Sequence, residues 1–149
     1  MNKIRLNNGI EMPQVGMGLF QLKGNETQTY IKQAIEAGYR LFDTASIYGN
    51  EADLGQAIKD SGIARENFFI SSKVWIHSDG YEATMKEFET SLNRLGTDYI
   101  DLYLIHQPMG DVYGSWRALE ELYTQGKIKA IGVSNFSEDR LLDFILKTK

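Results

Sequence analysis

Short apolar or β-branched segments recur along the chain about every 25 to 30 residues, which is the length of one βα unit. Each is predicted to be a strand, and together they cover residues 15–20, 40–45, 68–75, 99–106 and 128–136. Strands buried on both faces of a sheet read as nearly continuous apolar runs, as residues 128–133 do. The pattern therefore favours a parallel sheet covered by helices.

Segments with apolar residues three and four positions apart lie between these runs and are typical of helices with one buried face. The clearest spans residues 81–95 and is followed by Gly96, a residue type that commonly ends helices. Asn25 and Asn50 are predicted to cap two earlier helices, and two more are predicted around residues 116–123 and after Ser137. Five βα units result.

A small β-hairpin is predicted before these units. Residues 3–6 and 10–12 flank Asn7-Asn8-Gly9, and Asn-Gly is a strong hairpin signal because both residues tolerate positive φ. We expect residues 1–149 to form a single domain, in which residues 1–14 are a hairpin cap and residues 15–149 hold βα units one to five.

Two α/β folds fit this alternation, a doubly wound sheet and an eight-fold barrel. The dinucleotide fingerprint of the first needs a third glycine and a helix after Gly16-Met17-Gly18, and neither is found there. The second fold explains polar residues at several strand ends. Because five units are fewer than eight, we predict an incomplete (β/α)8, or TIM, barrel with exposed strand edges that allow self-association.

The composition is that of an ordinary globular protein, with 42% hydrophobic and 24% charged residues. A net charge of −4 provides no basic face for nucleic acid or an anionic membrane, so neither partner is predicted. The chain begins without the apolar segment of a signal peptide, and we expect a cytoplasmic protein. The absence of cysteine excludes disulfides, thiolate nucleophiles and cysteine-ligated zinc, and no metal site is predicted.

Four side chains that can handle a proton follow the ends of successive predicted strands, namely Asp43, Tyr48, Lys73 and His106. The Lys73 ammonium in an apolar strand needs a partner, and Asp43 is the natural one because neighbouring strands lie about 5 Å apart. Charged Lys73 would lower the pKa of the Tyr48 phenol from its ordinary value of about 10. The phenol could then give a proton to a developing alkoxide, while His106 orients a carbonyl.

Each of these residues alone also has an ordinary structural explanation. Asp43 can be a turn or cap residue, Lys73 can extend to solvent, and His106 can be a loop histidine. Lys73 could instead form a Schiff base, although that needs a neutral amine and Asp43 favours the charged form. It is their joint position at strand ends that indicates a site.

Four segments resemble motifs of the aldo-keto reductase family. Residues 38–55 read GYRLFDTASIYGNEADLG, residues 72–74 read SKV, residues 102–108 read LYLIHQP and residues 131–136 read IGVSNF. The resemblance implies a (β/α)8 barrel and an oxidoreductase that reduces aldehydes or ketones to alcohols with NADPH. It also implies that Tyr48 is the general acid, that Lys73 and Asp43 tune it, and that His106 orients the carbonyl of a small-molecule substrate.

The same resemblance implies positions for the cofactor and substrate. Ser134 and Asn135 would hold the nicotinamide carboxamide, with Asp43 near the ribose, although the Ser-Asn pair could equally cap the helix after it. Phe20 and Trp75 would line the substrate pocket together with His106, although both could simply pack in the core or rim.

In this family, barrel units six to eight carry the groove for the adenosine phosphates. We therefore expect this chain alone to bind NADPH weakly or not at all and to be an impaired or inactive reductase. The alternative is a non-catalytic half-barrel remnant that self-associates or binds a partner through its exposed edges.

Overall fold

The computed structural model describes residues 2–24 and 26–148, so Asn25, a predicted helix cap, lies outside the described residues. The elements follow in the order β1 (Lys3–Arg5), β2 (Glu11–Pro13), β3 (Met17–Gly18), α1 (Thr27–Glu36), β4 (Leu41–Asp43), α2 (Glu51–Asp60), β5 (Phe69–Val74), α3 (Tyr81–Leu95), β6 (Ile100–Ile105), α4 (Val112–Thr124), β7 (Ile128–Val133) and α5 (Glu138–Lys147).

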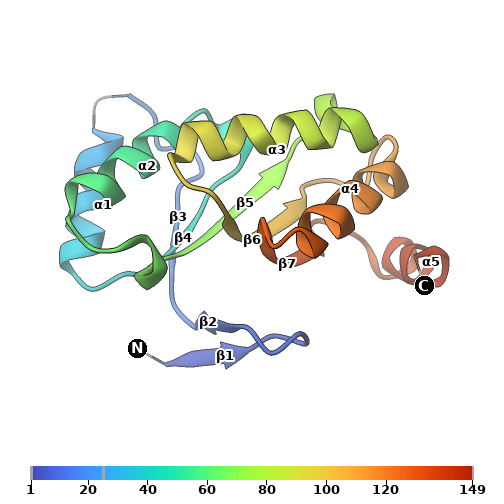
Figure 1. Ribbon diagram of the computed structural model, residues 1–149, viewed down its shortest axis with the longest axis horizontal. Coiled ribbons are helices and arrows are strands. Elements are labelled where there is room, and N and C mark those ends of the chain that lie inside the picture. The colour runs from blue at the N-terminus through green and yellow to red at the C-terminus, as the bar shows by residue number, and fades with distance from the viewer. Residues whose placement is uncertain (1, 25, 149) are drawn as a thin grey trace.

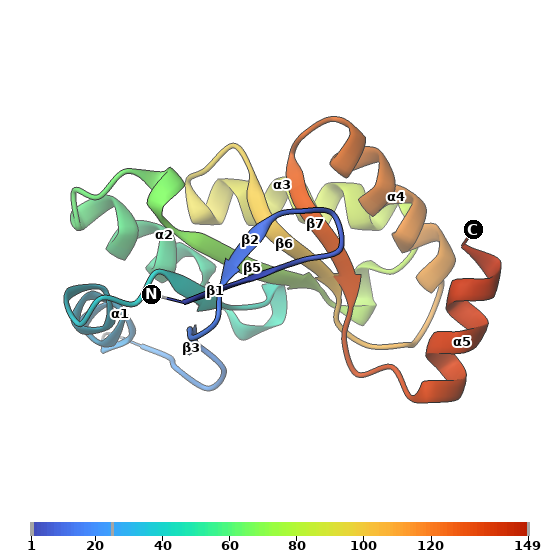
Figure 2. The same ribbon diagram turned by 90° about the horizontal axis from the view of Figure 1, so that it is seen from below.

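The main sheet contains five parallel strands in the order β3-β4-β5-β6-β7, which is also their order along the chain. Helices α1 to α4 lie along one side of this sheet, and the β1–β2 hairpin lies on the other (Figures 1 and 2). Five βα units in the arrangement of a partial (β/α)8 barrel are thus present, as the apolar runs predicted.

The core lies between the sheet and its helices. Strand β5 is buried along its whole length, including its polar residues Ser71, Ser72 and Lys73. Helix α3 buries Phe88, Leu92 and Leu95, as its pattern predicted. Helix α5 differs, because its predicted apolar face is largely open and Leu142 keeps 59% of its surface exposed.

The predicted hairpin is present, but its turn is longer than the two-residue type that Asn-Gly favours. The backbone N–H of Gly9 donates to the oxygen of Leu6 at 2.9 Å, and within this turn only Gly9 has a positive φ, of 90°. The Asn8 side chain donates to the backbone oxygen of Lys129 at 2.8 Å and so ties the hairpin to β7. Among the described residues, no helix combines the length and apolar character needed to cross a bilayer.

Candidate active site

Lys73 and Asp43 form a partly buried ion pair at the carboxyl end of the sheet. The Lys73 Nζ lies 2.8 and 2.7 Å from the two carboxylate oxygens of Asp43, and it donates a third hydrogen bond to the backbone oxygen of Thr44 at 2.9 Å. In the strand register Asp43 lies opposite Ser71, so the long lysine side chain reaches back along its strand to the carboxylate. All three hydrogens of the ammonium are therefore used.

Tyr48 lies beside this pair, at the end of a short 3-10 helix formed by Ser46–Tyr48. Its ring centroid is 5.5 Å from the Lys73 Nζ and 5.7 Å from the centroid of the His106 ring. Burial, and secondarily the Asp43 carboxylate, raise the pKa of the phenol above its ordinary value. The prediction that Lys73 lowers this pKa is wrong, because the ammonium is bonded to Asp43 and Thr44 and its charge is offset by the carboxylate.

His106 directly follows β6, and its side chain is buried against the indole of Trp75, with ring centroids 4.8 Å apart. Burial and the nearby Lys73 charge lower the pKa of the imidazole, and Asp43 opposes them. The imidazole is therefore neutral near pH 7. Its Nδ1 is buried and has no hydrogen-bond partner within the described part of the chain.

Tyr48, Trp75 and His106 line a cavity of about 630 Å³, a size common for small-molecule sites, whereas Lys73 and Asp43 are not among its lining residues. Its lining residues are Phe20, Gln21, Lys23, Ile47, Tyr48, Trp75, His106, Gln107 and Asn135. Gln21 (φ 66°) and Asn135 (φ 61°) are also the non-glycine residues with positive φ in the described ranges. Such strained backbone is concentrated at functional sites. Sequence reasoning missed Gln21, Lys23 and Gln107, which lie in loops without a periodic pattern, and Ile47, which lies in the short 3-10 helix Ser46–Tyr48.

Ser134 and Asn135 lie where β7 ends and are fixed against the end of β6. The Ser134 N–H donates to the oxygen of Ile105 at 2.9 Å, while the Asn135 Nδ2 donates to the backbone oxygen of His106 at 2.9 Å and to the Ser134 Oγ at 3.0 Å. This arrangement leaves the Ser134 hydroxyl hydrogen available as a donor and the Asn135 Oδ1 available as an acceptor. A donor beside an acceptor fits the oxygen and nitrogen of a carboxamide.

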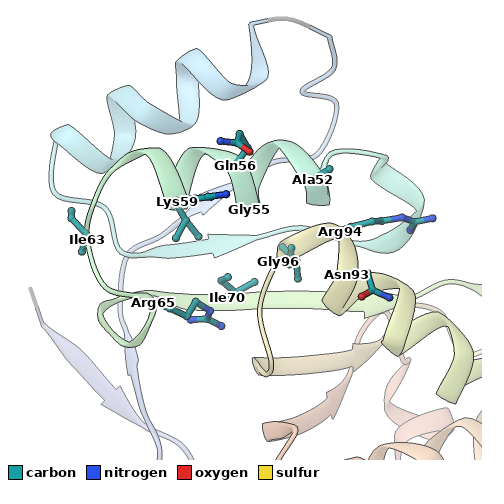
Figure 3. A pocket seen from close by; sticks show the side chains of 12 residues that line it. Ala52, Gly55, Gln56, Lys59, Ile63, Arg65, Ile70, Asn93, Arg94 and Gly96 are labelled. Atoms are coloured by element: carbon teal, nitrogen blue, oxygen red, sulfur yellow. The ribbon is translucent and has the colours of Figure 1, made fainter.

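A second cavity, of about 470 Å³, lies on the helix side of the sheet between α2 and the end of α3 (Figure 3). Its two arginines already have partners: Arg65 lies 2.7 Å from Asp101, and Arg94 lies 3.4 Å from Glu51. Its lining contains none of the predicted site residues. The candidate active site is therefore the cavity around Tyr48.

Sequence comparison now defines the class of protein. Residues 14–149 match the aldo/keto reductase family, so the chain belongs to this family, and the resemblance seen in the four motifs is confirmed. Members named among its relatives are oxidoreductases.

Particular relatives are close in sequence and in structure. The chain is 54% identical over 144 residues to glyoxal reductase of Bacillus subtilis (strain 168), covering 95% of this chain and 52% of that protein. A crystal structure of the aldo-keto reductase MGS-M4, from a deep-sea metagenome library of the Medee basin, superposes with a TM-score of 0.95 at 50% identity, covering 98% of this chain and 54% of that one.

A more distant structural relative is an aldo-keto reductase of Bombyx mori in complex with NADP. It superposes with a TM-score of 0.92 at 32% identity, covering 98% of this chain and 54% of the other. The chain thus spans about half the length of the relatives it matches.

Proposed function

We propose that this chain supplies the proton-donating part of an NADPH-dependent reductase that converts aldehydes or ketones to alcohols. One observation carries the proposal: a phenol that keeps its proton and a neutral imidazole line one cavity, with the Lys73–Asp43 ion pair beside the phenol. Family membership supports the same chemistry.

Tyr48 is the proposed general acid. Because its pKa is raised, the phenol remains protonated throughout the neutral pH range and can act as a proton donor. Its proton passes to the alkoxide that develops as the carbonyl is reduced. Lys73, whose Nζ lies 5.5 Å from the ring centroid, is held beside the phenol by its hydrogen bonds to Asp43.

His106 is proposed to orient the substrate. A neutral imidazole can donate a hydrogen bond to the carbonyl oxygen without taking a proton from Tyr48. Phe20, whose ring centroid is 5.1 Å from that of Tyr48, and Trp75 supply apolar walls for the carbon part of a small carbonyl compound.

Ser134 and Asn135 are the residues proposed to hold the nicotinamide carboxamide, and the partly exposed Asp43 carboxylate offers an acceptor for a ribose hydroxyl. When bound, the reduced nicotinamide supplies the hydride that no side chain can provide. The known relatives are about twice as long, and we therefore expect the 149-residue chain alone to bind NADPH weakly or not at all. Tight binding in a fluorescence titration would overturn that expectation.

A second candidate function rests on the edges of the sheet. Strands β3 and β7 are its two outermost strands, and each has one side without a neighbouring strand in the described chain. Such edges favour association, so a partner-binding or self-associating module is the alternative. A monomer in analytical ultracentrifugation at high concentration would count against it.

The reductase proposal is tested with a chimera, in which this chain is followed by the part of Bacillus subtilis glyoxal reductase that lies beyond the matched half. NADPH oxidation would be followed with an aromatic aldehyde, and the intact relative serves as positive control. We expect Tyr48→Phe to lower kcat by about 10²- to 10⁴-fold. The matched change Tyr30→Phe, on the exposed face of α1, should leave kcat unchanged. Equal rates for the two variants would refute the role of Tyr48.

A further inference from the structure

Asn50 immediately precedes α2, a position where asparagine usually caps the helix by accepting a hydrogen bond from its first turn. Its side chain makes no such bond, so the sequence-based prediction of an Asn50 cap is wrong. The side chain is instead almost completely buried, with 1% of its surface exposed. Asn50 therefore does not cap α2, and its amide group makes hydrogen bonds outside that helix.

The amide of Asn50 makes three hydrogen bonds to residues distant from α2. Its Oδ1 accepts from the hydroxyl of Thr44 at 2.6 Å. Its Nδ2 donates to the backbone oxygens of Leu19 at 2.8 Å and Leu22 at 3.0 Å. Behind it, the buried carboxylate of Glu51 accepts from the Ser72 hydroxyl at 2.7 Å and fixes the start of α2 to β5.

These bonds close two loops of the cavity. Thr44 and Asn50 flank residues 45–49, the loop that carries Tyr48, and their bond joins its ends. Leu19 and Leu22 flank Phe20 and Gln21, and the positive φ of Gln21 must be held by its surroundings. One amide group thus fastens both loops, whose aromatic rings contact each other at a centroid distance of 5.1 Å.

We propose that Asn50 is a positioning residue, which acts through its bonds to Thr44, Leu19 and Leu22 to hold Tyr48 and Phe20 in place in the cavity. This inference rests on the proposed role of Tyr48 as proton donor. Without these bonds the two loops move independently, and water reaches the phenol.

The pKa of Tyr48 depends on where its phenol lies and how far it is buried, so a titration of Tyr48 detects a change in its position. The charged and titratable groups around it are Asp43 and Lys73 at the strand ends, His106 after β6, and Lys23 on the cavity wall. Thr44→Val and Asn50→Ala change none of these groups. A changed titration in these variants therefore reflects altered placement or hydration of the phenol.

The test uses the 149-residue chain labelled with 3-fluorotyrosine and titrated by ¹⁹F NMR. The Tyr48 resonance is assigned by its loss in Tyr48→Phe. We expect Thr44→Val and Asn50→Ala to lower the pKa of Tyr48 toward its ordinary value and to broaden its resonance, whereas Thr44→Ser, which keeps the hydroxyl, retains the wild-type titration. Thr84→Val is the matched control, because Thr84 is equally buried and its hydroxyl likewise bonds to a side-chain oxygen, that of Ser115 at 3.0 Å.

An unchanged Tyr48 titration in Thr44→Val would overturn the proposal, as would an equal shift in Thr84→Val. Should Asn50→Ala not fold, the comparison of Thr44→Val with Thr44→Ser decides. The measurement needs neither cofactor nor turnover. An inactive chimera would therefore count against the proposed reaction and leave the positioning role to be judged by the NMR result alone.

Discussion

Removing either partner of the Lys73–Asp43 pair should destabilise the protein, but by unequal amounts. The Lys73 side chain is 8% exposed, whereas that of Asp43 is 37% exposed. Asp43→Asn leaves a nearly buried ammonium without its anion, and breaking a buried pair in this way costs about 3 to 5 kcal/mol. We expect about 3 kcal/mol, because the asparagine oxygen and Thr44 can still accept hydrogen bonds.

Lys73→Met should cost less, about 1 to 2 kcal/mol. The remaining Asp43 carboxylate is partly hydrated, and the loss includes about 1 kcal/mol for the Thr44 oxygen that loses its donor. The methionine side chain also fills the buried space with apolar atoms.

Urea unfolding of both single variants and the double variant gives the coupling free energy of the pair. The control is the exposed pair Lys127–Glu89, whose side chains are 39% and 51% exposed. Its coupling should stay below about 1 kcal/mol. The reasoning fails if Asp43→Asn costs no more than Lys73→Met, or if the two pairs couple equally.

Three further outcomes are expected. Because burial lowers the pKa of His106, the unfolded chain takes up the proton first, so stability falls as pH drops below about 6.5. His106→Gln should flatten the acid side of the urea-unfolding profile, and an unchanged profile in this variant would contradict the expectation. Gly55→Ala should destabilise the protein by about 1 to 3 kcal/mol, because the new Cβ would lie 2.3 Å from the backbone oxygen of Leu95, where α2 closely approaches α3 (Figure 3). In the control Gly18→Ala, the new Cβ meets no atom within 4 Å. Equal thermal midpoints for the two variants would contradict this expectation. On α5, Phe144→Ala should lower the free energy of unfolding by about 3 to 5 kcal/mol, because Phe144 is buried, whereas Leu142→Ala, at an exposed position, should lower it by less than about 0.5 kcal/mol. Guanidinium unfolding that ranks the two variants in the opposite order would contradict the orientation of this helix.

The strands were predictable because each contains a short apolar or β-branched segment between helical patterns. The proximity of Asp43 and Lys73 followed from their positions near the ends of neighbouring strands. Their effect on Tyr48 did not follow, because the pKa of the phenol is raised first by burial and then by Asp43, and the depth of burial is set only by the folded chain. A linear pattern does not contain that information.

Asn50 illustrates a different limit. Local preference predicts a helix cap at this position, and the bonds to Leu19 and Leu22 form only when loops separated by about thirty residues meet. The polar cavity residues Gln21, Lys23 and Gln107 were missed for a related reason, because a loop side chain that faces a cavity has no periodicity to reveal it.

The sequential strand order bears on how the protein is made. Every strand of the main sheet pairs with the strand just before or just after it in the chain, so each strand can pair as soon as the strand before it is in place. During synthesis, the strand bearing Asp43 can receive the one bearing Lys73 as soon as it leaves the ribosome, and His106 arrives with the next. The proton-handling groups are thus assembled in the order in which they are translated.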